Sequence, residues 1–181
     1  MTVIDWGKND VLKYLGSYFP RSYAEAYSLF SRFFTKHKIG WKKKTNIDVF
    51  DFGCGTGGQL IGMLTAIDKV MPGTTSITIS ALDGNKPSLR ICERIVSEFQ
   101  KHSHIMIKFR PLYMTIDDLY DLSLMKNVMT SEYDIVLSFK AVCEFITKAR
   151  FKDKNAYKQF VQAFISKMNN SPFPTQGTLM I

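Results

Sequence analysis

The sequence contains only three cysteines, Cys54, Cys92 and Cys143, and no two of them stand in a C-x-x-C spacing. This scarcity excludes a disulfide scaffold and a zinc site held by paired cysteines, and it favours a reducing compartment. The chain also has three histidines, none of which stands in a metal-ligand spacing. We therefore expect a cytoplasmic protein that holds no metal.

Long apolar runs are also missing. No stretch approaches the ~18–20 consecutive apolar residues that a membrane-spanning helix needs. Asp5, Lys8 and Asp10 interrupt the amino-terminal stretch, so a signal peptide is not predicted. With 181 residues, 45% of them hydrophobic, the chain can bury one sizeable core, and we expect no membrane partner.

Acidic residues are scarce relative to basic ones, 16 against 24, which gives a formal net charge of +8. The excess gathers in an acid-free segment, residues 32–44, where Phe33, Phe34 and Trp41 stand among cations. These cations are Arg32, Lys36, Lys38, Lys42, Lys43 and Lys44. A smaller basic cluster surrounds Phe151. Cations neutralise phosphates and aromatic rings stack on unpaired bases, so the clusters favour a nucleic acid partner, RNA rather than DNA. The alternative is a solvated segment whose aromatic side chains pack inside.

The richest local pattern is a glycine cluster at residues 53–58. An apolar run over residues 47–52 predicts a buried strand before it, and an amphipathic segment from Gln59 to about Val70 predicts a helix after it. Glycines permit positive φ and a close approach of the backbone to a ligand. The helix that follows directs unpaired N–H groups at the same place. Strand, glycine turn and helix together predict a nucleotide cradle.

The glycines fit two templates. Gly53, Gly55 and Gly58 satisfy the G-x-G-x-x-G dinucleotide fingerprint, which is weak alone. Asp51 with Gly53, Gly55 and Gly57 also forms Asp-x-Gly-x-Gly-x-Gly, which resembles motif I of the class I S-adenosylmethionine-dependent methyltransferases. Asp51 favours the second template, because a carboxylate beside two phosphates is repelled. An ordinary glycine-rich turn remains the structural alternative.

The resemblance implies S-adenosylmethionine as cofactor and S-adenosylhomocysteine as product. It places Asp51 toward the methionine end of the cofactor and makes Gly53, Cys54, Gly55 and Gly57 the loop around it. It does not identify a catalytic residue. It implies a Rossmann-like fold.

A second cofactor contact is predicted where the next strand ends. Residues 76–82 are rich in β-branched side chains and end in Asp83-Gly84-Asn85. Asp83, with Gly84 beside it, is placed to accept from both ribose hydroxyls of an adenosine nucleotide. Methyltransferases and NAD enzymes share this device, so Asp83 does not choose between them, and an Asp before Gly is often only a turn residue.

Two later segments carry further expectations. Asp117 and Asp118 follow a predicted helix over residues 87–100 and a predicted strand over residues 104–109. The resemblance implies that they accept from the adenine amino group, and the alternative is that they start a short helix over residues 118–125. Residues 133–139 predict another strand and resemble methyltransferase motif IV. The resemblance places Ser138, with Lys140 and Glu144, beside the cofactor and on the side of the methyl acceptor.

The order of elements predicts an α/β fold with a doubly wound, mostly parallel sheet over residues 46–181. Helical periodicity at residues 157–168 and an apolar end at residues 177–181 supply the last helix and a fifth strand. The sequence stops inside that strand, so we expect a fold truncated there or completed by a partner chain or dimer. Residues 1–45 read as a helical extension, with a capping box at Ser22 and Glu25 that starts a helix after Pro20. Methyltransferases often cover the cofactor with an amino-terminal segment, so the resemblance implies that Tyr18 or Arg21 of this extension caps the methionine carboxylate.

The sequence therefore favours methyl transfer from S-adenosylmethionine to RNA or another anionic acceptor. It lacks the Asn/Asp-Pro-Pro-Tyr stretch of amino-methylating nucleic-acid enzymes and the Pro-Cys of cytosine-C5 enzymes. Three alternatives remain open. They are a small-molecule or protein methyltransferase, a non-catalytic binding or assembly protein that keeps the fold, and, more distantly, an NAD-dependent oxidoreductase.

Overall fold

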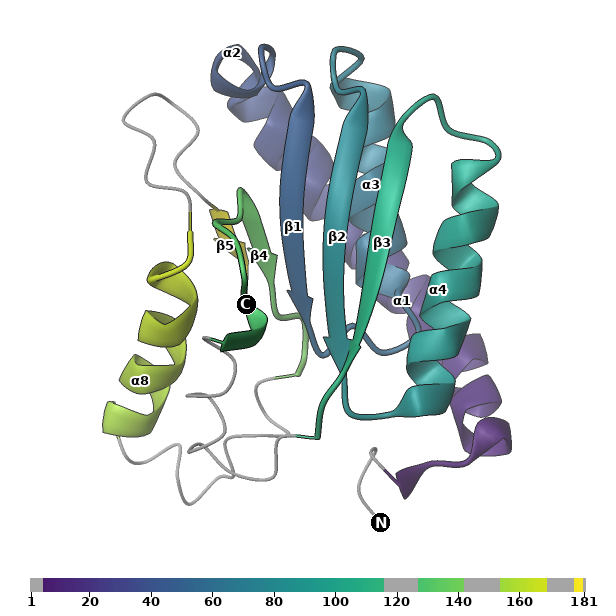
Figure 1. Ribbon diagram of the computed structural model, residues 1–181. Coiled ribbons are helices and arrows are strands. Elements are labelled where there is room, and N and C mark those ends of the chain that lie inside the picture. The colour runs from purple at the N-terminus through teal and green to yellow at the C-terminus, as the bar shows by residue number, and fades with distance from the viewer. Residues whose placement is uncertain (1–4, 116–126, 142–153, 169–177, 181) are drawn as a thin grey trace.

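The chain forms a five-stranded parallel sheet in the order β3-β2-β1-β4-β5 (Figure 1). The computed structural model describes residues 5–115, 127–141, 154–168 and 178–180. The strands are β1 (Asn46–Phe52), β2 (Ser76–Asp83), β3 (Met106–Tyr113), β4 (Ile135–Leu137) and β5 (Thr178–Met180). This is the strand order of a Rossmann-like sheet, whose direction of winding reverses between β1 and β4. The predicted fold class is confirmed.

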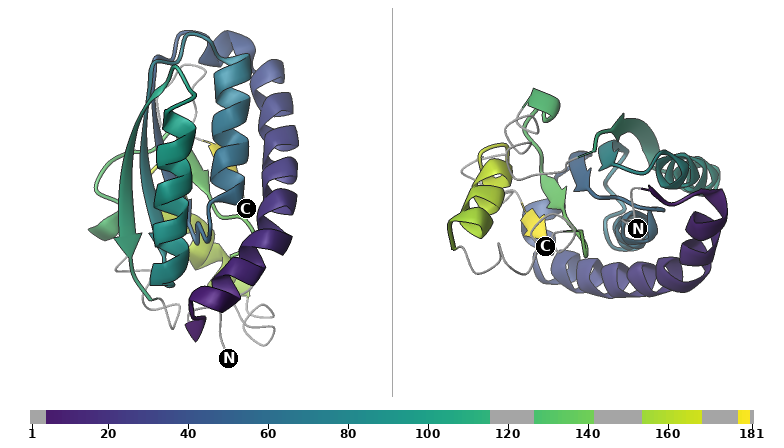
Figure 2. Two further views of the ribbon diagram at one scale, coloured as in Figure 1. Left: turned by 90° about the vertical axis from the view of Figure 1, so that its right-hand side faces the viewer. Right: turned by 90° about the horizontal axis from the view of Figure 1, so that it is seen from below.

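Helices cover both faces of the sheet. They are α1 (Lys8–Lys36), α2 (Lys38–Trp41), α3 (Gly58–Val70), α4 (Lys86–Gln100) and α8 (Lys154–Ile165). Figure 2 shows α3 and α4 against one face, α1 outside α3 as a further layer, and α8 on the opposite face. None of the helices described is long and apolar enough to cross a membrane.

Alternating side chains of β1 build the two halves of the core. Ile47 and Val49 belong to the cluster beneath α1 and α3, and Phe50 and Phe52 belong to the cluster beneath α8. The ring of Phe52 lies 5.5 Å from that of Phe160, centroid to centroid, in an edge-on contact. A two-residue period with both faces apolar explains why this strand reads as a continuous hydrophobic run.

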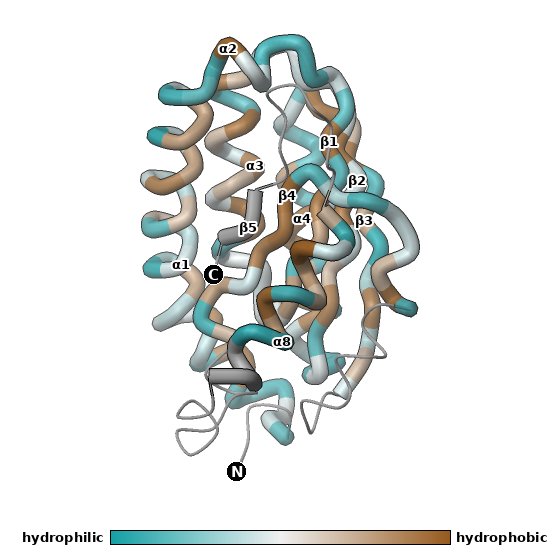
Figure 3. The backbone as a smooth tube through the Cα atoms, turned by 90° about the vertical axis from the view of Figure 1, so that its left-hand side faces the viewer, coloured by the Kyte–Doolittle hydropathy of each residue, from teal (hydrophilic) through white to brown (hydrophobic). Residues whose placement is uncertain are grey.

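The helices α1 and α3 meet along a seam of small residues. A Cβ added at Gly58 would lie 2.8 Å from the carbonyl oxygen of Phe19, and one at Gly62 would lie 2.5 Å from that of Tyr23. Only glycine lets the two backbones approach this closely. Figure 3 shows α3 apolar along much of its length, whereas α1 alternates between polar and apolar residues. This is the pattern of a helix that packs on one side only.

The predicted helix start at Ser22 is wrong. α1 runs without interruption through Pro20, and Ser22 is buried in mid-helix. Proline offers no N–H to the carbonyl of Gly16, and α1 bends in this region (Figure 2). The helix nevertheless continues, because buried side chains before and after the bend, from Val11 to Phe34, hold it in place. Tertiary packing here outweighs a local penalty of about 3 kcal/mol.

The other predicted elements are confirmed with small shifts. β3 extends to Tyr113, beyond the expected end at Phe109, and includes Pro111. Proline is tolerated there because β3 is an edge strand, where one side of the backbone has no neighbour to bond. The expected short helix at residues 118–125 lies outside the described residues. The division of the chain at residue 45 stays a prediction.

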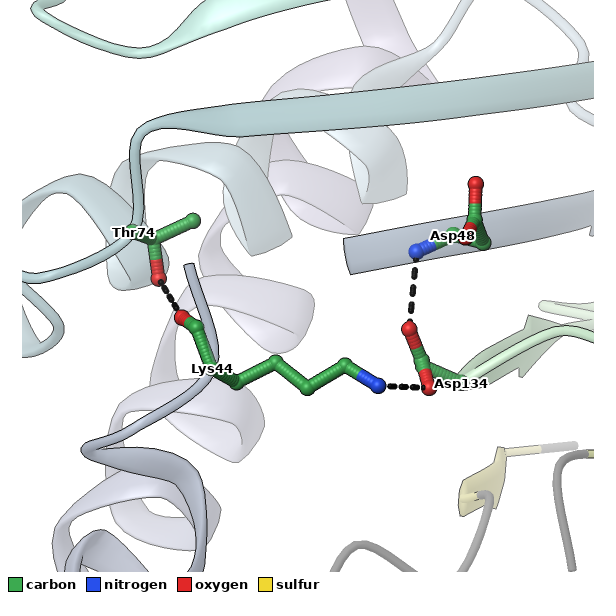
Figure 4. A network of polar contacts seen from close by, with 4 residues as sticks. All are labelled: Lys44, Asp48, Thr74 and Asp134. Carbon is green, nitrogen blue, oxygen red and sulfur yellow. Dashed lines mark hydrogen bonds and ion pairs between the residues drawn. The ribbon is translucent and has the colours of Figure 1, made fainter. Parts of the chain in front are cut away.

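A polar network ties the amino ends of the central strands together (Figure 4). The carboxylate of Asp134 accepts from the ammonium of Lys44 and, at 2.9 Å, from the backbone N–H of Asp48. The hydroxyl of Thr74 donates to the carbonyl of Lys44 at 3.2 Å. The network joins β1 to the segments that precede β2 and β4.

Candidate functional site

The glycine loop between β1 and α3 lies at the carboxyl ends of the strands. Gly53, Gly55 and Gly57 have φ values of 71°, 52° and 87°. The backbone N–H groups of Gly53 and Cys54 donate to the carbonyl of Leu82, at 2.8 and 3.0 Å, and so anchor the loop on β2. Positive φ is costly for any residue with a Cβ, so the three glycines follow from the shape of the loop.

Two of these glycines also make room for neighbours. A Cβ at Gly53 would lie 2.4 Å from the Cβ of Ala141, and one at Gly57 would lie 2.7 Å from the sulfur of Cys92. Gly55, by contrast, has no atom of another described residue within 4 Å of its Cβ position. Neighbouring residues therefore pack against the loop at Gly53 and Gly57, whereas no described residue covers Gly55.

Asp51 is fully buried beneath the loop. Its Oδ2 accepts a 3.4 Å hydrogen bond from the side-chain amide of Gln59, and its Oδ1 has no partner among the described residues. Burial raises the pKa of Asp51 to about 8, a shift that the Gln59 hydrogen bond only partly opposes. The carboxyl is therefore mostly protonated at pH 7. The argument that its charge would repel a pyrophosphate loses its force for this reason.

Asp83, at the end of β2, holds the loop from the other side. One carboxylate oxygen accepts from the N–H of Gly55 at 2.7 Å, and the other accepts from the N–H of Asn85 at 2.7 Å. Burial raises the pKa of Asp83, against the effect of both backbone hydrogen bonds. Gly84 lies half-buried next to it. Each carboxylate oxygen has a second lone pair, so the group can still accept from a ligand.

The segment after β4 closes the site from a third side. Ser138 is fully buried, and its hydroxyl has no hydrogen-bond partner among the described residues. Lys140 has a φ of 60°, which is unusual for a residue other than glycine. Its ammonium forms a 2.5 Å ion pair with Glu25 of α1. A strained backbone of this kind is common at functional sites.

α1 lies over the glycine loop. A small cavity of about 20 Å³ remains between them. Tyr14, Tyr18 and Ser22 line it from α1, and Cys54, Gly55 and Lys140 are among the residues that line it from below. The rings of Tyr14 and Tyr18 stack at 4.5 Å. Arg21, the other residue predicted to cap the cofactor, lies 6.0 Å from the Tyr18 ring centre.

Cys54 points inward as well as lining the cavity. Its side chain is fully buried. Hydrogen bonding to the Cys92 thiol, reinforced by burial, raises the pKa of the Cys54 thiol well above its usual value. A neutral thiol of this kind acts as a small packing residue rather than as a nucleophile.

The structure thus brings together seven of the predicted site residues, at the glycine loop and the ends of β1 and β2. They are Asp51, Gly53, Cys54, Gly55, Gly57, Asp83 and Gly84. Ser138 follows the neighbouring strand β4. Asp117, Asp118 and Glu144 lie outside the described residues.

Two residues of the site escaped sequence reasoning. Gln59 donates to both Asp51 and the Cys54 carbonyl, the latter at 2.9 Å. Asn85 caps α4 by accepting from the N–H of Ser88, and it also donates to the Trp6 carbonyl at 3.0 Å. Sequence signals for both were available. Gln59 is a polar residue in the first turn of an otherwise apolar helix, and Asn85 stands three residues before Ser88, the spacing of an N-cap.

The basic cluster predicted to bind nucleic acid lies elsewhere. α2 is at the amino ends of the strands, at the top of Figure 1, whereas the glycine loop is at their carboxyl ends. Phe34 and Trp41 are buried in the core, and Lys44 is paired with Asp134. These two aromatic side chains follow the alternative of the sequence analysis, in which they pack inside. Residues 148–153 lie outside the described part of the chain.

The residues present fit an adenosine-containing cofactor. The loop has positive-φ glycines, and no residue in the described part of the chain fills the space over Gly55. Asp51 Oδ1, just before the loop, and the Ser138 hydroxyl, just after the neighbouring strand β4, are buried polar atoms without a hydrogen-bond partner among the described residues. A cavity of about 20 Å³ holds about one water, so a cofactor would require α1 or the Lys140 segment to move.

No protein-family profile matches this chain, and neither does any curated protein. Among solved structures, it is similar to MnmC2 from Aquifex aeolicus, at 16% identity and a TM-score of 0.47, covering 76% of this chain and 43% of that one. A candidate S-adenosylmethionine-dependent methyltransferase from Methanococcus maripaludis matches at 14% identity and a TM-score of 0.45, covering 87% and 57%. Magnesium protoporphyrin IX methyltransferase from Synechocystis, crystallised with S-adenosylmethionine, matches at 14% identity and a TM-score of 0.45, covering 90% and 72%. The chain spans about half the length of the first two structures.

Proposed function

We propose that this protein binds S-adenosylmethionine at the glycine loop and directs its methyl group to an anionic acceptor, RNA in the first place. One observation carries the proposal. The Asp51-x-Gly-x-Gly-x-Gly stretch forms a positive-φ loop at the carboxyl end of β1, and Asp83 at the end of β2 is hydrogen-bonded directly to that loop. Ligands of open α/β sheets bind in this position, next to the switch point.

The residues take distinct roles in this proposal. Asp83 accepts from the ribose hydroxyls with its remaining lone pairs, and Gly55 lets the cofactor approach the backbone. Asp51, mostly protonated at pH 7, can donate a hydrogen bond as well as accept one. Ser138 and Lys140 face the acceptor. Bound S-adenosylmethionine supplies an activated methyl group, and orientation of the two reactants by the protein can contribute about 7–11 kcal/mol.

Calorimetric titration tests the cofactor assignment. We expect micromolar binding of S-adenosylmethionine and S-adenosylhomocysteine, and no binding of NAD. Asp83→Ala removes the carboxylate and should weaken binding at least about tenfold, since a charge-assisted hydrogen bond is worth 1.5–3 kcal/mol or roughly that factor. Asp48→Ala, a carboxylate at the other end of the sheet, is the matched control and should bind normally. Absence of binding to the folded wild-type protein would refute the proposal.

Transfer of a labelled methyl group tests the acceptor. We expect incorporation into RNA that falls as salt rises, because cations of the protein replace counterions along the phosphate backbone. Incorporation into protein or small molecules of a cell extract, but not into RNA, would favour the alternative acceptor classes.

The size of the cavity favours a second candidate, a non-catalytic binding or assembly protein that keeps the fold. About 20 Å³ lies between α1 and the loop, and the Glu25–Lys140 ion pair joins the two sides. This candidate predicts a folded protein that binds no S-adenosylmethionine and transfers no methyl group. The calorimetric titration therefore separates it from the enzyme.

A further inference from the structure

We infer that the acceptor surface for single-stranded nucleic acid is the groove between the start of α1 and one face of α4, rather than the basic cluster around α2. The inference rests on the proposed function, because it locates the RNA that the methyl group would reach. Its central feature is a cavity of about 490 Å³, separate from the cavity over the glycine loop.

Three cations line this cavity from two elements. Lys8 begins α1, and Arg90 and Arg94 lie one helical turn apart on α4. None of the three forms an ion pair with another residue in the described part of the chain, and all three are exposed. Glu93 is the one acid among the described residues that line the cavity. The cations therefore leave a net positive charge in a concave site, where a phosphodiester is favoured.

An aromatic row leads from this cavity toward the glycine loop. Trp6, two residues before Lys8, makes an edge contact with Tyr14 at 5.3 Å, and Tyr14 stacks on Tyr18 at 4.5 Å. The Trp6 carbonyl accepts from Asn85, at the start of α4, so the row begins beside the cavity. Tyr14 and Tyr18 line the cavity over the loop, so the row ends at the methyl-transfer site.

The end of the row is available to a ligand. Tyr18 is 45% exposed, and its ring is backed by Tyr14 on one side. The guanidinium of Arg21 lies 6.0 Å from its centre. Cations that follow a groove and aromatic rings that accept bases are the combination that binds unpaired nucleic acid with little sequence preference. Figure 2 shows the first turns of α1 beside α4, which places both features on one side of the molecule.

The basic cluster around α2 lacks this combination. Phe34 and Trp41 are buried, and Lys44 is held by Asp134. It also lies at the opposite end of the sheet from the glycine loop (Figure 1). Its exposed lysines, Lys42 and Lys43, therefore serve as an internal control of equal charge.

Fluorescence anisotropy with a labelled single-stranded RNA of mixed sequence tests the inference. We expect Arg90→Ala/Arg94→Ala to weaken binding about tenfold and to lower the slope of log K against log salt by about 1.4, or 0.7 per lost phosphate contact. Lys42→Ala/Lys43→Ala should leave both quantities near the wild-type values. Equal losses in the two double variants, or a larger loss in the second, would overturn the inference.

Substitution of Tyr18 tests the inference independently, through base stacking. Tyr18→Ala should weaken RNA binding at least about fivefold through lost base stacking, whereas Tyr18→Phe keeps the ring and should bind as wild type does. Equal binding by all three proteins would contradict the stacking role. Inorganic phosphate that competes with RNA at millimolar concentration, with no effect of Tyr18→Ala, would identify a free-anion site instead.

Calorimetry with S-adenosylmethionine keeps the two proposals distinguishable. The Arg90→Ala/Arg94→Ala variant should bind the cofactor as wild type does, because neither arginine lines the cavity over the loop. Loss of RNA binding with intact cofactor binding supports the groove. A wild-type protein that binds the cofactor but no RNA refutes the groove alone, and one that binds RNA but no cofactor refutes the proposed function alone.

Discussion

Each end of the central sheet holds two carboxyl groups. The groups that hydrogen-bond or pair with these carboxyls differ between the two ends. At the amino ends, Asp134 accepts from the Lys44 ammonium and from the Asp48 backbone. At the carboxyl ends, and among the described residues, Asp51 has one amide partner and an oxygen without a partner, and Asp83 has backbone partners only. No described cation forms an ion pair with either carboxyl group at the carboxyl end.

This difference distinguishes polar groups that stabilise the fold from polar groups that are available to a ligand. A buried carboxyl paired with a cation and an N–H is satisfied within the fold. A buried carboxyl without a cation is costly to ionise, and such groups gather at functional sites. The amino end therefore contributes to stability, and the carboxyl end holds groups that a ligand can satisfy. Four sets of variants test this division, from the largest expected effect to the smallest.

The pH dependence of Asp51 should give the largest effect. Its pKa rises from 3.8 to about 8 on folding, so the folded state holds an extra proton between these values. Stability must then fall as pH rises through this window, by at most about 1.4 kcal/mol per pH unit or about 6 kcal/mol in total. Asp51→Asn should remove this slope. Urea unfolding from pH 4 to pH 9 measures it, with Asp10→Asn in the first turn of α1 as control. Equal slopes in wild type and Asp51→Asn would contradict the burial of Asp51.

Substitution in the glycine loop should follow. Gly53→Ala places a Cβ at positive φ and 2.4 Å from the Ala141 Cβ. The strain and the overlap together should lower the free energy of unfolding by about 3 kcal/mol. Gly73→Ala, whose Cβ would lie 3.2 Å from the Lys42 carbonyl outside the positive-φ region, should change it by under about 1 kcal/mol. Chemical denaturation of both variants checks this, and similar losses would refute the special role of the loop.

Asp134 tests the other end of the sheet. Asp134→Ala leaves the Lys44 ammonium and the Asp48 N–H without their acceptor, which should cost about 2 kcal/mol. Asp134→Asn keeps an acceptor for the N–H and should cost less. Cofactor affinity, measured by calorimetry, should be unchanged in both. A weakened cofactor affinity in the folded variants would show that the two ends are not separate in function.

The smallest effect is expected at the Glu25–Lys140 ion pair. Both side chains are 45% exposed, and exposed pairs contribute little because water screens them. Glu25→Gln should therefore change the free energy of unfolding by under about 0.5 kcal/mol. Glu98→Gln, which breaks the exposed pair with Lys101, is the matched control. A loss several times larger in Glu25→Gln would mean that the pair fixes α1 on the loop.

Local sequence patterns predicted the sheet and its glycine loop well. The hydrophobic periodicity of β1, α3 and β2, and the glycine and proline residues that end them, are local signals that span a few residues. The position of Asp83 beside the loop could be predicted because it stands at the end of a strand. The position of α1 could not be predicted in the same way. Pro20 is a local breaker, and the helix continues through it because α1 packs against remote segments, chiefly α3.

Features assembled from distant segments were also beyond prediction. The cavity between α1 and α4 joins Lys8 to Arg90 and Arg94, although two helices and two strands separate α1 from α4 in the sequence. The burial of Trp41 depends on its contacts with Phe33 and Phe34 of α1. In both cases composition identified charged or aromatic residues, but packing decided which of them a ligand can reach.

The glycine seam between α1 and α3 also bears on how the chain folds. During synthesis α1 precedes α3, and its apolar stripe of Ala26, Phe30 and Phe34 has no surface to cover it until α3 emerges. Gly58 and Gly62 then allow the two helices to close into contact. Gly58 is thus both the last glycine of the binding loop and the first glycine of the seam. The same residue therefore belongs to the ligand site and allows α1 to pack against α3 as the chain folds.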